Sequence, residues 1–147
     1  GGVCMRTAYD VSKYIITKCS QELKPVSNLQ LQKVLYFIQV AFLQKFGKPC
    51  FEDDFEAWMY GPVIPSIYSI YCGAGASDIL FIYDDLDNLF EKDERVLVDS
   101  IIEVKRSLGP WALVNETHEI GRAWSQVYHK GEGNRSIIPK RLIERYG

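Results

Sequence analysis

The stretch from 27 to 46 constrains the fold of this chain most strongly, because it predicts a helix that is apolar around most of its circumference. Two apolar stripes recur along it at three- and four-residue steps. Ser27 and Gln30 have the spacing of a capping box, and Gly47 supplies a stop signal. The narrow polar face that remains consists of Gln30, Lys33 and Gln44. A helix of this kind must be covered on several sides, so the sequence predicts a central, buried helix.

Two glutamines, Gln32 and Gln39, lie seven residues apart and fall between the apolar stripes. Buried amides need hydrogen-bond partners. We therefore expect both side chains to bond to neighbouring backbone, with a role in ligand binding as the alternative.

Shorter helical patterns on either side predict a mainly α, compact, single-domain helical bundle around this helix. Thr7 and Asp10 have capping-box spacing at the start of an amphipathic helix that extends to about residue 23. Further helices are expected at about 65–72, 93–108, 110–114, 124–128 and 139–146. The apolar face expected for the helix at 93–108 consists of Leu97, Ile101, Val104 and Leu108. We expect residues 6–147 to form one domain and residues 1–5 to be a leader or cloning remnant.

The segment 55–65 alternates aromatic and apolar residues and then reaches Gly61-Pro62, which predicts a short strand ended by a rigid turn. A second β-rich run at 79–83 would complete a small β-hairpin with 55–60, since an exposed edge of this kind invites aggregation. The turn carries no acid, base or nucleophile and fixes the directions of its aromatic side chains. We therefore predict partner binding through a set that contains Trp58, Tyr60, Gly61, Pro62 and Tyr68. Of the five residues Trp58, Tyr60, Tyr68, Trp111 and Trp124, we expect about three to be core.

The net charge of −2 hides a strongly acidic middle. Residues 52–103 contain thirteen Asp and Glu side chains against Lys92 and Arg95, a balance of −11. This region would complement a basic partner, and the predicted electrostatic contacts are Asp53, Asp54, Asp84 and Asp85. The alternative is that these carboxylates are simply the solvated faces of loops and one helix.

Reactive chemistry has little support in the sequence. There is no phosphate-binding or dinucleotide motif, and the four cysteines form no CxxC pair, so we expect neither metal nor cofactor. His118 is expected to cap the preceding helix or bond a backbone carbonyl, with a hydrolase built around it as a remote alternative. The two N-terminal helices would allow a DNA-binding regulator, but the second is too apolar for a recognition helix. No apolar run approaches the roughly 18 to 20 residues that span a bilayer.

The order of motifs resembles that of a known family. The helices that contain Asp10-Val11 and Leu29-Gln30-Leu31-Gln32-Lys33-Val34-Leu35-Tyr36 are similar to its opening motifs. Gly47-Lys48-Pro49-Cys50-Phe51, then Glu56-Ala57-Trp58-Met59-Tyr60-Gly61-Pro62-Val63, and finally Thr117-His118 with Trp124 follow in the same order, although Ala123 replaces a usual proline. The chain is identified as a member of the Panacea-domain, SocA-like antitoxin family. The resemblance implies a cytoplasmic, bacterial or phage-borne antitoxin that neutralises a cognate toxin protein by direct contact, without catalytic residues. Self-association of the chain stays open.

Overall fold

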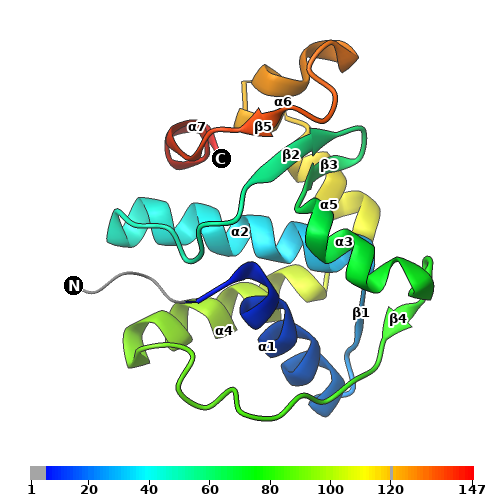
Figure 1. Ribbon diagram of the computed structural model, residues 1–147, viewed down its shortest axis with the longest axis vertical. Coiled ribbons are helices and arrows are strands. Elements are labelled where there is room, and N and C mark those ends of the chain that lie inside the picture. Colours follow the sequence, from blue (N-terminus) through cyan, green and yellow to red (C-terminus); the bar gives the residue numbers. More distant parts are fainter. Residues whose placement is uncertain (1–5, 120) are drawn as a thin grey trace.

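The computed structural model describes residues 6–119 and 121–147 of the chain. The leader expected at residues 1–5 lies outside them. The central element is α2 (Asn28–Phe46), which runs through the middle of the molecule in Figure 1. Helices and two small sheets surround it, so the predicted mainly α domain around a buried helix is confirmed.

Both predicted capping boxes are present. The Ser27 side chain accepts from the N–H of Gln30, and the Gln30 amide oxygen accepts from the N–H of Ser27. Thr7 and Asp10 make the same reciprocal pair at the start of α1. Gly47 ends α2 with a φ of 68°, a left-handed conformation that glycine adopts without steric cost. Local sequence signals therefore set the start of α1 and both ends of α2.

The described residues form six further helices. They are α1 (Ala8–Gln21), α3 (Pro65–Tyr71), α4 (Lys92–Arg106), α5 (Pro110–Thr117), α6 (Ala123–Tyr128) and α7 (Lys140–Tyr146). Of these, α6 packs against α7 and the three-stranded sheet, and the other five pack on α2. Two short 3₁₀ turns, η1 (Cys72–Ala74) and η2 (His129–Gly131), follow α3 and α6. In Figure 1, α1 and α4 pack along one side of α2, whereas α7 and the three-stranded sheet lie along the other. The helix α2 is thus enclosed from both sides.

The strands pair differently from the prediction. A three-stranded antiparallel sheet has the order β3-β2-β5 and consists of β3 (Gly61–Val63), β2 (Phe55–Trp58) and β5 (Ile137–Ile138). The second sheet pairs β1 (Val26–Ser27) with β4 (Asp78–Ile79). The prediction that 55–60 pairs with 79–83 was therefore wrong, because β2 pairs with β3 and β5 and β4 pairs with β1. The chain after α3 continues to the N-terminal end of α2, and the place beside β2 is taken by a strand from the C-terminal region.

The interior around α2 confirms one prediction and corrects two. The Gln39 amide bonds the carbonyl of Phe51 and the N–H of Cys50, and Gln32 accepts from the N–H of Ile64, as expected for buried glutamines. Lys33, predicted on the polar face, is instead fully buried.

The second correction concerns α4, which turns Val98 and Ile102 inward and leaves Val104 exposed. Leu97 and Ile101 are only partly buried and pack against the edge of the core. Within the described part of the chain, no helix combines the length and apolar character that crossing a membrane requires.

Candidate protein-binding site

The turn between β2 and β3 is a tight hairpin whose two loop residues are Met59 and Tyr60. Trp58 pairs with Gly61 across its base, and Pro62 pairs with Ala57. Pro62 thus lies within a strand, where the sequence predicted only a break. The strand β3 lies at the edge of its sheet, where a residue without an N–H group is tolerated.

Aromatic side chains around this hairpin enclose an apolar groove of about 370 Å³. The rings of Trp58 and Tyr68 meet edge to face with centroids 5.2 Å apart, and the guanidinium of Arg135 lies 4.3 Å from the Trp58 ring centroid. The lining includes Leu29, Trp58, Met59, Tyr60, Tyr68 and Arg135, and we call this the aromatic groove. The structure therefore brings together the aromatic residues that the sequence singled out.

The groove continues toward α5 through a second aromatic pair. Tyr60 and Trp111 meet edge to face at 5.5 Å, and both are exposed, at 47% and 60%. Of the five aromatic residues expected to supply about three core members, only Trp124 is buried. Clustering of large exposed aromatic side chains is characteristic of protein-binding surfaces.

Lys33 lies beneath the hairpin and fixes its position. Its Nζ donates a hydrogen bond to the carbonyl oxygen of Pro62 at 2.9 Å, inside the core. Burial lowers the pKa of Lys33 to about 7, because an apolar environment disfavours the charged ammonium. Gly61 lies directly against it: a Cβ there would come within 2.8 Å of both Lys33 Cε and Thr117 Oγ1. Sequence reasoning missed Lys33 as a site residue.

A stacked pair supports the hairpin from the other side. The Trp124 indole N–H donates to the carbonyl of Trp58 at 2.8 Å, and the ring of His118 stacks on Trp124 with centroids 3.8 Å apart. His118 occupies the C-cap of α5 as expected, through its backbone N–H. Its Nε2 is buried and has no hydrogen-bond partner among the described residues. Burial, with the nearby charge of Lys33, lowers the pKa of His118 below its usual value, so the ring is held neutral as a packing element.

The four predicted acidic contacts lie apart from the groove, in two places. Asp53 accepts the N–H of Ala8 at the start of α1, and Asp54 forms an ion pair with Lys140 at 2.8 Å. These two carboxylates tie chain segments together. Asp84 and Asp85 are exposed on the segment between β4 and α4. Asp54 is exposed as well, but of the four side chains only those of Asp84 and Asp85 make no ion pair or hydrogen bond among the described residues.

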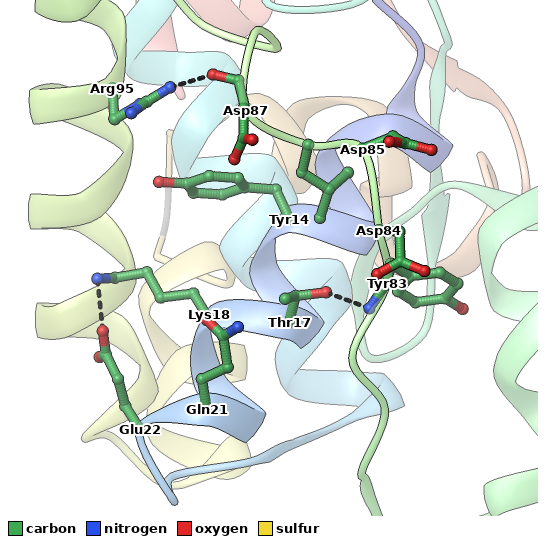
Figure 2. Close-up of a pocket in the computed structure, with 11 residues that line it drawn as sticks. Tyr14, Thr17, Lys18, Gln21, Glu22, Tyr83, Asp84, Asp85, Asp87 and Arg95 are labelled. Carbon is green, nitrogen blue, oxygen red and sulfur yellow. Dashed lines mark hydrogen bonds and ion pairs between the residues drawn. The ribbon is translucent and has the colours of Figure 1, made fainter.

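Asp84 and Asp85 line a separate, polar pocket of about 400 Å³ between this segment and α1 (Figure 2). The Tyr83 N–H donates to Thr17 Oγ1 at 2.9 Å, and Lys18 pairs with Glu22 at 2.8 Å. Figure 2 shows Lys18 paired with Glu22 and Arg95 on the backbone carbonyl of Asp87, whereas the carboxylates of Asp84 and Asp85 do not converge with these groups on a common point. Among residues 6–119 and 121–147, no three His, Cys, Asp or Glu side chains group as metal ligands would.

The fold and its surfaces define a small, mainly helical domain with an aromatic groove on one side and an acidic segment on another. Residues 31–125 match the model of the family described as "Antitoxin SocA-like, Panacea domain", and the chain belongs to this family. The matched range contains most of α2, both strands of the hairpin, the acidic segment and α4. It therefore covers the acidic segment and the hairpin side of the groove, whereas Leu29 and Arg135 of the groove lie outside it.

A curated relative, "Antitoxin SocA" of Caulobacter vibrioides (strain NA1000 / CB15N), is 39% identical over 70 residues. That match covers 48% of this chain and 37% of the relative, so the chain matches little more than a third of the relative's length. No solved structure matches the chain.

Proposed function

We propose that this domain is an antitoxin that neutralises a cognate toxin protein by direct contact, with no bond-making step. Membership of the SocA-like family supports the class of function. The observation that carries the proposal is the aromatic groove, which is open to solvent and rests on a fixed base.

The groove has the properties of a site for a protein's side chain. Its walls are mainly apolar and aromatic, and such residues supply most of the hot spots in protein interfaces. The backbone of the hairpin is held by the buried hydrogen bond from Lys33 to Pro62 and by the partly buried one from Trp124 to Trp58. A preorganised surface loses less conformational freedom on binding, which favours affinity. The occupant that fits is an apolar or aromatic side chain of the toxin.

The alternative DNA-binding function gains no support from this architecture. A recognition helix has to present polar side chains to base edges in the major groove. The helix that would serve, α2, is enclosed, and even its lysine at position 33 is buried.

A double variant of the two exposed rings tests the proposal. Replacing Tyr60 and Trp111 by alanine is expected to weaken the complex with the toxin at least about tenfold and to abolish growth rescue. Both side chains lie on the surface, about half exposed, so the melting temperature should stay close to that of the unchanged protein. The measurement is co-expression with the product of the adjacent open reading frame, followed by titration of the purified pair.

The matched control is Val104→Ala, which removes an exposed apolar side chain from α4. It should bind and rescue like the unchanged protein. Full rescue by the double variant would exclude the groove as the contact surface. Failure of the unchanged protein to associate with a toxic neighbour would exclude the proposed function itself.

A further inference from the structure

The segment that joins β4 to α4, residues 80–91, is a strap that passes beneath α1 in Figure 1. Its first part is held to α1 by alternate backbone groups: the N–H of Phe81 donates to Ser20 Oγ at 3.1 Å, and the N–H of Tyr83 donates to Thr17 Oγ1 at 2.9 Å. The rings of Phe81 and Tyr83 lie 4.5 Å apart on one face, as expected two residues apart in an extended chain. Residues 80–83 therefore run in an extended conformation along α1, beyond the short strand β4.

The other edge of this extended segment is open. Alternate residues of an extended chain direct their N–H groups to opposite edges, so those of Leu80 and Ile82 point away from α1. Neither donates a hydrogen bond to any group in the described part of the chain. Leu80 is 70% exposed, Phe81 55% and Ile82 56%. Folded proteins normally cover or charge such an apolar edge, because it pairs readily with another strand.

The surroundings of this edge are acidic. Asp78 precedes it, and the exposed carboxylates of Asp84, Asp85 and Asp87 follow it. Asp85 has a φ of 63°, which ends the extended run and turns the strap toward α4. The two ends of the strap are fixed, by the β1–β4 pairing and by the Arg6 guanidinium on the carbonyl of Leu89. The edge is thus short, held at both ends of the strap and flanked by negative charge.

We propose that the edge of residues 80–82 accepts an extended strand of a basic partner protein, in which apolar residues alternate with lysine or arginine. The backbone of that strand would pair with Leu80 and Ile82, and its basic side chains would meet Asp78, Asp84 and Asp85. A second copy of this chain is a poorer occupant, because antiparallel pairing would bring Asp78 of one copy near Asp84 of the other. The proposal rests on the proposed function only in taking the toxin as the natural partner.

A synthetic peptide tests the edge without the toxin. The probe is a capped nine-residue peptide that alternates lysine and valine, and its control carries N-methyl groups on every residue, which removes the backbone donors of both of its edges. We expect the unmodified peptide to bind the intact chain at least tenfold more tightly than the methylated one, measured by fluorescence anisotropy. Equal binding of the two peptides would overturn strand pairing without any change to the protein.

Variants of the chain separate the contributions of the backbone N–H, the side chain and the acidic charges to peptide binding. Leu80→Pro removes the outward N–H and should weaken peptide binding at least tenfold. Leu80→Ala keeps this N–H and should weaken peptide binding less than threefold. The double variant Asp84→Asn and Asp85→Asn should weaken binding several-fold at low salt and little at high salt. Its matched control is Glu103→Gln with Glu144→Gln, two exposed acids elsewhere, which should leave binding unchanged. If the two double variants weaken peptide binding equally, the acidic residues beside the edge do not contact the peptide specifically.

Association with the toxin then separates the two proposals. Loss of both peptide and toxin binding in Leu80→Pro, with an unchanged melting temperature, supports both. Normal toxin binding by Leu80→Pro excludes the edge as its contact and leaves the proposed function standing. If peptide binding responds to the edge variants as expected but the chain never associates with the product of the adjacent open reading frame, the result supports the edge proposal alone. A dimer of the unchanged chain that Leu80→Pro dissociates would show that the edge pairs with itself, which overturns the basic partner.

Discussion

Replacing Gly61 by alanine is expected to lower the free energy of unfolding by about 2–4 kcal/mol, the range for backbone strain combined with overpacking. Two causes act together at this position. The φ of 107° is one that residues with a side chain rarely adopt, and the new Cβ would lie 2.8 Å from Lys33 Cε and Thr117 Oγ1. Because both neighbours are buried, neither has room to withdraw. Chemical denaturation at pH 7 measures the loss.

Two other glycines separate these causes. Gly47 has a positive φ of 68° but open space around it, so Gly47→Ala should cost about 1 kcal/mol from the backbone alone. Gly73 has open space and no positive φ, so Gly73→Ala should stay within about 0.5 kcal/mol of the unchanged protein. A loss at Gly61 no greater than that at Gly47 would mean that the hairpin does not press on Lys33.

Lys33 should make the stability of the fold rise with pH between about 7 and 10. Its folded-state pKa is about 7, whereas the unfolded side chain keeps its ordinary value near 10.5. Between these values the unfolded chain binds the extra proton, so raising the pH favours the folded state. Below pH 7 both states are protonated, and this group adds no slope. From pH 7 to 9.5 we expect a gain of about 3 kcal/mol from a single group shifted this far.

The comparison for this prediction is Lys33→Met, which fills a similar volume without a titrating group. The variant should lack the rise, so the difference in unfolding free energy between the two proteins should change with pH. Measurements should end near pH 9.5, because burial raises the pKa of Tyr36 and Tyr71, and their ionisation in the unfolded state opposes folding at higher pH. Parallel curves for the two proteins would contradict a Lys33 that is neutral in the folded state.

The local signals in the sequence were sufficient for the helices and their caps. A capping box or a stop glycine acts over three or four residues, and Ser27, Gln30 and Gly47 behave as such rules require. Strand pairing is a long-range property, and nothing local identifies Ile137 and Ile138 as the partners of β2. The aromatic cluster was predicted because a rigid Gly-Pro turn gathers its neighbours, but exposure depends on what packs above each ring.

Lys33 shows how residue type can mislead where spacing would have served. It lies four residues after Leu29 and three before Tyr36, which places it on the apolar stripe that also contains Val40 and Leu43. We assigned it to the polar face because lysine is rarely buried. The long aliphatic stem packs inside, and the amine reaches a backbone carbonyl of β3. Periodicity was the better guide at this position.

The hairpin is anchored at its base, and its two tip residues, Met59 and Tyr60, are exposed and are not part of the core. Mutations at the tip are therefore nearly neutral for folding, whereas those at Gly61 or Lys33 are not. A domain built in this way can acquire a new target by exchanging a few outward-facing side chains, while the frame that displays them is inherited unchanged.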